Sequence, residues 1–202
     1  MNVQRRAPRI LLLAGAFLCG LVVVLACIVQ FAGRPSSAIG PGIASVGGPF
    51  KLEDQNGKPV TDEDFKGRPF LVFFGYTHCP DICPTTLFEL SEIMKSLGKD
   101  ADRTAAVFIT VDPERDTPAV LKDYLSNFDA HVRGLTGDPD AVAAALKAYR
   151  VYAKKVPLKD GDYTMDHTAV VYLMDKDGHF VAPLNLEKQT PQAAADQLRR
   201  YL

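Results

Sequence analysis

Two cysteines stand close together in the stretch "GYTHCPDICPTTL", which covers residues 75–87. Cys79 and Cys83 have three residues between them, and Pro80 and Pro84 directly follow them. Thiols at this separation can serve as a redox pair, as ligands of a soft metal ion or as a structural disulfide. The elements around the cysteines and the compartment in which they lie decide among these chemistries.

The cysteines follow an apolar run and precede a helical pattern. Residues 69–76, "PFLVFFGY", are almost continuously apolar and predict a buried strand. Apolar residues then recur at helical spacing from Pro84 to Leu97, and Gly98 ends the pattern. The cysteines therefore lie in a strand-to-helix turn at the carboxyl end of a strand, where open sheets place their ligands.

The start of the predicted helix favours negative charge at the cysteines. Free N–H groups and the positive end of the helix dipole stabilise an anion, so we expect a lowered thiol pKa. If residues 79–83 already form a helical turn, both sulfurs face the same side and can converge on one ion. Two thiolates suit monovalent copper, which gains from an imidazole as a third donor. A disulfide is also allowed, although three intervening residues loosen the geometry that an unstrained bridge needs.

The order of the predicted elements indicates an α/β fold. We expect, in chain order, a hairpin at 49–61, a strand at 69–76, a helix at 84–97, a strand at 105–112 and a helix at 117–128. A short strand at 132–137, a helix at 138–149, a hairpin at 167–185 and a closing helix at 191–201 follow. Strands that alternate with helices pair in parallel, and the last hairpin adds antiparallel strands. We therefore expect a thioredoxin-like mixed sheet flanked by helices.

Among the four histidines, His167 is the one placed to approach the cysteines. It stands directly before the apolar run "TAVVYLM", residues 168–174, which predicts a buried strand. In thioredoxin-like folds the loop at this location lies against the cysteine turn. We interpret His78 mainly as part of the turn, and His131 and His179 as solvated loop residues.

The beginning of the chain predicts a membrane anchor. Residues 10–29 carry no charge, and Arg5, Arg6 and Arg9 precede them. A helix of this length spans about 30 Å, the thickness of the hydrocarbon core, whereas a cleaved signal needs only ~7–15 apolar residues. Because basic residues stay in the cytoplasm, we expect a single pass through a bacterial cytoplasmic (inner) membrane, with the following domain in the periplasm. Cleavage or lipidation of this segment is the alternative.

The chain of 202 residues divides into four predicted parts. They are a cytoplasmic N-terminus (residues 1–9), a transmembrane anchor (10–31), a flexible Gly/Pro/Ser-rich tether (32–48) and a globular domain (49–202). Cys19 and Cys27 lie in the predicted anchor, so only Cys79 and Cys83 reach the oxidising, periplasmic side of the membrane. The net charge of −1 gives no sign of nucleic-acid binding.

Four segments resemble a known family. They are "GYTHCPDICPTTL", "VDPERDTPAVLKDYL", "YRVYAKKVPLKDGDYTMDHTAVVYLMDKDG" and the N-terminal anchor. Together, and in this order, they resemble the Sco/SenC family of membrane-tethered copper proteins, which assist assembly of the CuA centre of cytochrome c oxidase. The resemblance covers nearly all of the exported domain, from Phe50 to the end.

The resemblance implies a copper site formed by Cys79, Cys83 and His167. It implies a membrane-anchored copper chaperone whose partner is the copper-bearing subunit of cytochrome c oxidase, with a periplasmic copper donor and a thiol reductant as further partners. Family members are also credited with reduction of the cysteines of the CuA site. A thiol-disulfide oxidoreductase that uses Cys79 and Cys83 without metal delivery is therefore the alternative. A peroxidase fits less well, because the close pair is unlike a lone peroxidatic cysteine.

Several charged residues near the cysteines are candidates for tuning the site. They are Asp81 within the motif, and Asp112, Glu114, Arg115 and Asp116 after the second predicted strand. The alternative interpretation of each is an ordinary solvated loop or helix-capping residue.

The segment "YRVYAKK", residues 149–155, is either a surface that faces a partner or an exposed strand edge guarded by lysines. Met165, close to His167, is interpreted as a packing residue rather than a copper donor.

Overall fold

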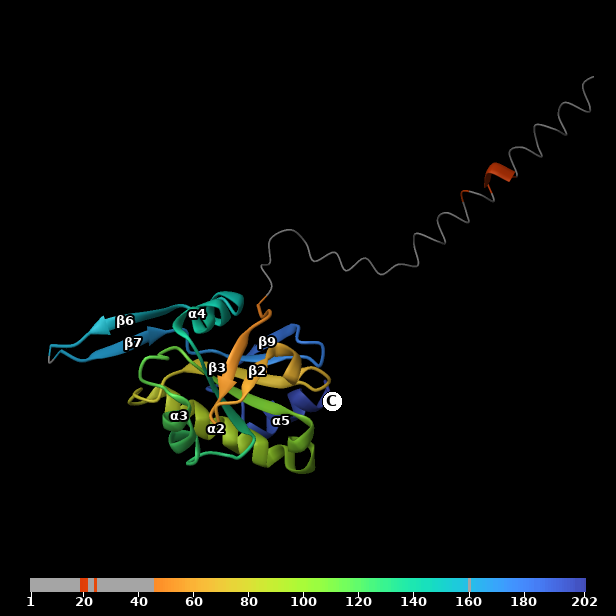
Figure 1. Ribbon diagram of the computed structural model, residues 1–202. Coiled ribbons are helices and arrows are strands. Elements are labelled where there is room, and N and C mark those ends of the chain that lie inside the picture. Colours follow the sequence, from red (N-terminus) through yellow and green to blue (C-terminus); the bar gives the residue numbers. More distant parts are fainter. Residues whose placement is uncertain (1–18, 22–23, 25–45, 160) are drawn as a thin grey trace, which may run out of the picture. The chain divides into compact units, whose positions relative to one another are not determined.

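The computed structural model describes residues 19–21, 24, 46–159 and 161–202. A seven-stranded mixed sheet organises the part from residue 46 onward (Figure 1). Its strands in spatial order are β2 (Pro59–Thr61), β1 (Lys51–Asp54), β5 (Val132–Thr136), β4 (Ala105–Thr110), β3 (Phe70–Gly75), β8 (Val171–Met174) and β9 (Phe180–Leu184). The central strands β5, β4 and β3 run parallel, and every other pairing is antiparallel. This arrangement confirms the predicted mixed sheet.

Helices cover both faces of this sheet. They are α2 (Ile82–Leu97), α3 (Pro118–Leu125), α4 (Pro139–Ala148) and α5 (Pro191–Arg199), with short 3-10 helices η1 (Asp62–Phe65) and η2 (Gly98–Arg103). Helices α2, α3 and α5 lie on one side of the sheet and α4 on the other (Figure 1). The start of α3 follows the prediction, because the hydroxyl of Thr117 accepts a hydrogen bond from the amide of Val120 and Pro118 is the first helical residue.

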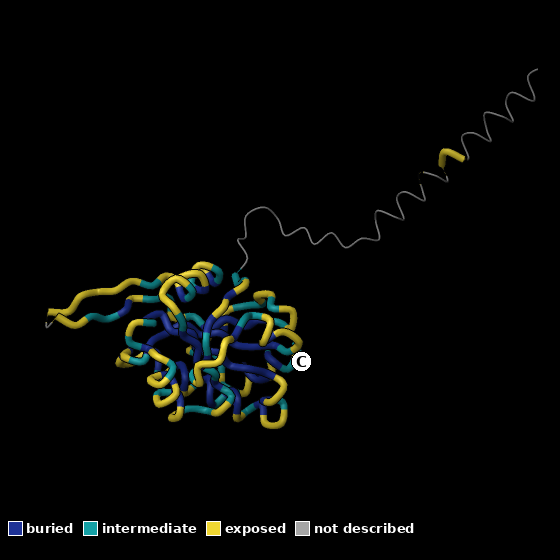
Figure 2. The backbone as a smooth tube through the Cα atoms, viewed as in Figure 1, coloured by how far each residue is buried: buried dark blue, intermediate teal, exposed yellow. Residues whose placement is uncertain are grey.

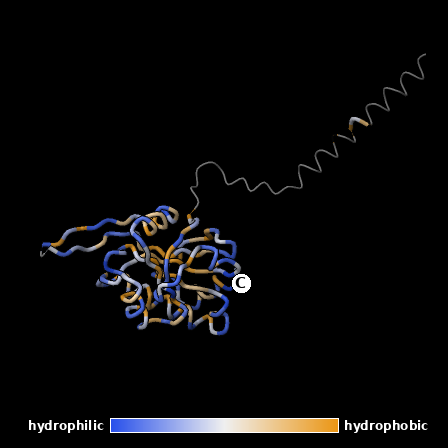
Figure 3. The backbone as a smooth tube through the Cα atoms, in the orientation of Figure 1, coloured by the Kyte–Doolittle hydropathy of each residue, from blue (hydrophilic) through white to orange (hydrophobic). Residues whose placement is uncertain are grey.

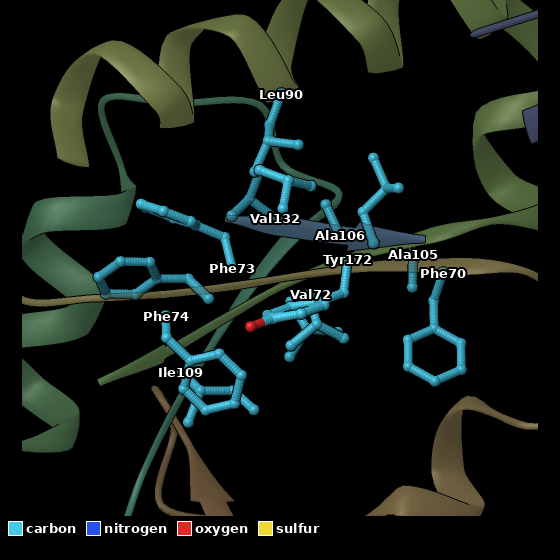
Figure 4. Close-up of a cluster of buried hydrophobic side chains, with 14 of the residues drawn as sticks. Phe70, Val72, Phe73, Phe74, Leu90, Ala105, Ala106, Ile109, Val132 and Tyr172 are labelled. Atoms are coloured by element: carbon cyan, nitrogen blue, oxygen red, sulfur yellow. The ribbon is translucent and has the colours of Figure 1, made fainter. Parts of the chain in front are cut away.

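The central strands are apolar throughout because both of their faces are buried. Phe73 points toward α2, whose Leu90 lies above it, while Phe74 and Ile109 lie on the opposite side of the sheet (Figure 4). All four side chains are completely buried. Each contributes about 1.5–3 kcal/mol through removal of apolar surface from water. Hydrophobic residues accordingly gather along the strands in the interior (Figure 3).

A second, two-stranded sheet was not predicted. Strands β6 (Ala153–Pro157) and β7 (Tyr163–His167) pair antiparallel with each other and with no strand of the large sheet. This β6–β7 arm extends away from the other elements (Figure 1), and most of it is exposed (Figure 2). Lys154 and Lys155 lie in its exposed strand β6. Of the two interpretations of residues 149–155, the exposed strand with lysines agrees with β6, which belongs to a separate hairpin.

The predicted anchor and tether lie largely outside the described residues. Within residues 10–48 only 19–21, 24 and 46–48 are described. No helix among the described residues combines the length and the apolar composition needed to cross a membrane. At the start of the folded part, Val46 packs against the core and the amide of Gly47 donates a hydrogen bond to the carbonyl of Ala148 at 3.0 Å.

Candidate metal centre

Cys79, Cys83 and His167 come together beyond the carboxyl end of β3. One ligand atom from each, two sulfurs and a ring nitrogen, lie within 4.8 Å of one another. The Sγ atom of Cys83 is 3.6 Å from Nε2 of His167, although 84 positions separate the two residues in the sequence. Neither Cys79 nor Cys83 takes part in a disulfide, and both are buried. The structure thus brings together all three residues that were predicted as metal ligands.

The cysteine turn is helical only in its last residues. Helix α2 begins at Ile82, so Cys83 lies in its first turn while Cys79 precedes it. The amide of Cys79 donates instead to the carbonyl of Tyr76 at 3.3 Å, which folds the chain back before the helix starts. Residues 79–83 therefore do not form one helical turn, and the sulfurs converge through this reverse turn instead.

Gly75, the last residue of β3, forms the floor beneath Cys83. A Cβ atom at this position would lie 2.8 Å from Sγ of Cys83 and 2.8 Å from Cε2 of Phe108, closer than atoms approach one another. A glycine inside a buried strand is a known sign of such a close approach. The sequence contained this signal for a residue that shapes the site, but it was not interpreted in that way.

Burial raises the pKa of the Cys83 thiol well above its ordinary value of 9.0, and the backbone amide of Tyr76 opposes the shift only partly. Nearby Cys79 and Asp116 raise this pKa further. The predicted lowering of the pKa by the helix N-terminus is therefore wrong for Cys83, because desolvation outweighs the helix dipole. A metal ion that binds here must displace a proton from this sulfur.

His167 presents a lone pair to the cysteines. Its Nδ1–H donates to the carbonyl of Thr168 at 3.2 Å, which leaves Nε2 unprotonated in the neutral ring. Burial lowers the pKa of this imidazole, so the neutral form predominates at pH 7. The ring of Tyr76 packs edge-on against the imidazole, with 5.7 Å between centroids and 88° between planes. These contacts fix both the tautomer and the orientation of the ring.

The donor set fits one soft, three-coordinate metal ion. With bonds of about 2.3 Å to sulfur and about 2.0 Å to nitrogen, the donors of a trigonal ion lie roughly 3.5–4 Å apart. The 3.6 Å between the Cys83 sulfur and the His167 nitrogen agrees with this separation. Two sulfurs and an imidazole in an apolar environment favour monovalent copper over hard cations.

Asp116 orders the turn that carries Cys79. Its carboxylate accepts hydrogen bonds from the amide of Thr77 at 3.0 Å, from the hydroxyl of Thr77 at 2.6 Å and from the hydroxyl of Thr110 at 2.6 Å. The side chain is completely buried, and burial raises its pKa despite these three bonds. Asp116 thus acts on the site through Thr77 rather than by direct contact with a ligand.

The other charged candidates differ in their burial and in their contacts. Asp112 is buried and accepts hydrogen bonds from Arg115 and from the hydroxyl of Tyr163. Glu114 is exposed and forms an ion pair with Lys155 of the β6–β7 arm. Asp81 is exposed at the start of α2, and its side chain makes no capping hydrogen bond.

The remaining histidines stay outside the candidate site. His78 is exposed, and its Nδ1 lies 3.1 Å from the hydroxyl of Thr77. His131 is only partly exposed and pairs with Asp129 and Asp102, so it is more than a solvated loop residue. His179 lies in the exposed β8–β9 turn, as expected.

Comparisons with known proteins agree with this geometry. The family model described as SCO1/SenC matches residues 40–202. The mitochondrial protein SCO1 of Saccharomyces cerevisiae is 45% identical over 156 residues, which cover 75% of this chain and 53% of the yeast protein. The chain therefore spans little more than half the length of its yeast relatives.

Solved structures share the fold. ScoI of Bradyrhizobium japonicum with copper bound is 66% identical and has a TM-score of 0.76, and the match covers 78% of this chain and 100% of that chain. BsSco, described as a member of the Sco family of cytochrome c oxidase assembly proteins with a disulfide switch, is 27% identical with a TM-score of 0.62. That match covers 79% of this chain and 94% of BsSco. Family model, sequence relatives and solved structures therefore agree, and the chain belongs to the SCO1/SenC family.

Proposed function

We propose that this protein is a copper chaperone that carries one copper ion on Cys79, Cys83 and His167 and supports assembly of the CuA centre of cytochrome c oxidase. The observation that carries this proposal is the convergence of two unbridged sulfurs and one oriented imidazole nitrogen within 4.8 Å of one another. The copper ion is cargo, so the site must both hold it and release it.

The number of ligands suits a carrier better than a structural metal site. Structural zinc sites are closed by four protein ligands. Within residues 46–159 and 161–202, no fourth His, Cys, Asp or Glu joins this group of three. A site with three ligands leaves the ion open on one side to a donor from a partner, which permits transfer by ligand exchange.

The ligands themselves control uptake of the ion. The raised pKa of Cys83 means that its thiol is protonated before binding, so uptake releases a proton from this sulfur. The imidazole of His167 is neutral and needs to lose no proton from Nε2. Two thiolates and a neutral imidazole give a net charge of about −1 with copper(I) and zero with copper(II). Groups around the site can therefore bias the oxidation state.

The relatives support the proposed cargo and partner. The Bradyrhizobium ScoI structure contains copper, and BsSco is described as a cytochrome c oxidase assembly protein. The copper-bearing subunit of the oxidase is accordingly the proposed recipient. The uncharged residues 10–29 support a membrane anchor, with the copper-binding domain in the periplasm of a bacterium.

Copper(I) titration of the full-length chain in detergent, against a competing chelator, tests the ligand assignment. We expect about one tightly bound ion per chain for the wild type, and strongly weakened binding for Cys79→Ser, Cys83→Ser and His167→Ala. His131→Ala serves as the matched control, because it removes a partly exposed histidine that pairs with Asp129 and Asp102. Wild-type affinity in His167→Ala would show that the third ligand is assigned wrongly.

A second candidate function is reduction of the oxidase cysteines by the Cys79 and Cys83 pair. The observation that favours it is that both thiols are free and adjacent. Deletion of the protein, followed by measurement of CuA loading, separates the two functions. Rescue by added copper favours delivery, whereas rescue by an exogenous thiol reductant favours reduction.

A further inference from the structure

His167 lies in a strand that is not part of the large sheet. It is the last residue of β7, which pairs only with β6. At the base of the β6–β7 arm, the amide of Thr168 donates to the carbonyl of Tyr152 at 3.0 Å, and the amide of Tyr152 donates to the hydroxyl of Thr168 at 3.1 Å. These bonds connect the two sides of the arm to each other at its base. Besides the chain connections at its two ends, side-chain contacts to the rest of the domain hold His167 relative to the cysteines.

Arg115 makes several of these contacts. Its guanidinium carbon lies 3.8 Å from the ring centroid of Tyr163, the first residue of β7, and its Nη1 donates to the carbonyl of Tyr163 at 3.0 Å. Its Nε donates to the buried carboxylate of Asp112, which also accepts a hydrogen bond from the Tyr163 hydroxyl at 2.9 Å. Arg115, Asp112 and Tyr163 thus each contact the other two, and together they link the loop after β4 to the start of β7.

Tyr163 and His167 lie on the same face of β7, because alternate residues of a strand share a face. A contact that fixes one end of this short strand therefore fixes the direction of the other. Thr164 adds a second link, since its hydroxyl lies 2.7 Å from the hydroxyl of Tyr76, whose ring packs against His167.

The same loop also holds the cysteine turn. Asp116, one residue after Arg115, binds the amide and the hydroxyl of Thr77, two positions before Cys79. Residues 112–116 therefore contact both segments that supply metal ligands. Asp116 contacts the cysteine turn, whereas Asp112 and Arg115 contact the arm. The guanidinium of Arg115 also lies 5.9 Å from the ring centroid of Tyr76, next to that turn.

We propose that the 112–116 loop is a bracket that sets the distance between the two halves of the copper site, with Arg115 as the positioning residue for His167. This inference rests on the copper-binding function proposed above. Arg115 touches neither the ion nor its ligands; it keeps β7 in the orientation that turns Nε2 toward Cys83. Loss of its side chain removes the contacts of the guanidinium with Tyr163 and weakens the contribution of the histidine ligand. The Glu114–Lys155 ion pair and the contact of Asp116 with the cysteine turn remain.

Arg133 provides a matched control for the test. Like Arg115, it pairs with a buried aspartate, since its Nη2 lies 2.9 Å from Oδ2 of Asp54, and it lies over an aromatic ring, 5.7 Å from the centroid of Phe65. It belongs to β5 and contacts neither the β6–β7 arm nor the cysteine turn. Arg133→Ala therefore reproduces the loss of a partly buried arginine without affecting the bracket.

The decisive experiment is a double-mutant cycle on the full-length chain, read out by copper(I) affinity. We expect Arg115→Ala to weaken binding by about 10- to 100-fold, the usual effect of removing a partner that orients a ligand. In the His167→Ala background the same change should have no further effect, because the ligand through which Arg115 acts is already absent. Arg133→Ala should leave the affinity unchanged. Equal losses from Arg115→Ala in both backgrounds would overturn the proposal.

A measurement without metal tests the bracket separately from the proposed function. Hydrogen–deuterium exchange of the metal-free chain should be faster at the β7 amides in Arg115→Ala than in the wild type, and unchanged there in Arg133→Ala. Unchanged β7 exchange in Arg115→Ala would overturn the bracket even if copper binds. Conversely, faster exchange in a chain that binds no copper would support the bracket while the proposed function fails.

A milder variant covers the case in which Arg115→Ala does not fold. Tyr163→Phe keeps the aromatic ring under the guanidinium and removes only the hydrogen bond to Asp112. We expect a smaller loss of copper affinity and a smaller increase in β7 exchange than in Arg115→Ala. Wild-type behaviour of Tyr163→Phe in both measurements, together with an unfolded Arg115→Ala, would also count against the bracket.

Discussion

Gly75 lies against the sulfur of Cys83, so closely that a single added methyl group would come within 2.8 Å of it. We expect Gly75→Ala to displace Cys83 and Phe108, and to lower the free energy of unfolding by about 1–3 kcal/mol, the usual cost of overpacking a core. Because the displaced atom is a proposed copper ligand, the copper(I) affinity should fall as well. Urea unfolding and chelator competition measure the two effects.

Gly134→Ala separates stability from ligand geometry in this test. A Cβ atom at Gly134, in the middle of β5, would press on the side chain of Leu125 in α3, away from the cysteines. This variant should also lose stability, but it should keep the wild-type copper affinity. Equal affinity losses in the two glycine variants would indicate that overpacking anywhere in the sheet disturbs the site.

Asp116→Asn should loosen the cysteine turn. Three donors converge on the two carboxylate oxygens of Asp116, and an amide side chain offers only one oxygen. We expect a loss of about 1–3 kcal/mol, because at least one buried donor near Thr77 is left without an acceptor. The thiol of Cys79 should react faster with an alkylating reagent.

The control for this change is Asp140→Asn in the exposed first turn of α4, which should alter neither the stability nor the thiol reactivity appreciably. An Asp116→Asn variant as stable as the wild type would mean that relief from burying a charge compensates fully for the lost acceptor.

His131 should make the stability depend on pH. The carboxylates of Asp129 and Asp102 raise the pKa of its imidazole above the ordinary value of 6.5, with the Asp129 hydrogen bond as the main cause. Since the folded state binds the proton more tightly than the unfolded state, the stabilisation is fully present below about pH 6.5 and is lost as the pH rises through the higher folded value.

Unfolding of the wild type and of His131→Gln at about pH 5.5 and about pH 8.5 measures this contribution. The difference should be largest at the lower pH and stay below about 1 kcal/mol, because the pair is partly exposed and screened by water. Added salt should reduce it. A difference that grows toward high pH would contradict the assignment.

Copper should stabilise the folded chain, and its removal by a chelator should reverse the effect. An ion that binds only the folded state at 100 times its dissociation constant contributes about 2.7 kcal/mol. We expect the thermal midpoint to rise with copper(I) in the wild type but not in Cys79→Ser, where a ligand is missing. A similar rise in the cysteine variant would point to binding elsewhere.

The elements of the large sheet could be predicted because their signals are local. The two predicted hairpins turn at glycines with positive φ, Gly57 at 73° and Gly178 at 82°. The dipeptides Asn56-Gly57 and Asp177-Gly178 are typical of such turns. The continuous apolar run of β3 corresponds to a strand buried on both faces. Local propensity and the final packing agree for these segments.

The β6–β7 arm was missed because its stability does not come from a buried face. Most of its residues are exposed, so neither strand has the alternation of apolar and polar residues that reveals a strand in sequence. Its position depends on Arg115 and Asp112, which are distant in the chain. The pKa of Cys83 was wrongly predicted for a related reason, because the helix start is visible in the sequence but the depth of burial is not.

The two sulfurs of the site differ in access. Cys79 as a residue keeps 9% of its surface exposed, whereas Cys83 is fully enclosed between Gly75 and the surrounding core. If the pair is oxidised to a disulfide, we expect an incoming thiolate to reach the sulfur of Cys79 more easily than that of Cys83. The mixed disulfide then forms on Cys79, and Cys83 leaves as a thiolate that takes up a proton, because burial raises the pKa of this thiol. The enclosure of one cysteine thus gives thiol exchange at this site a preferred direction of attack.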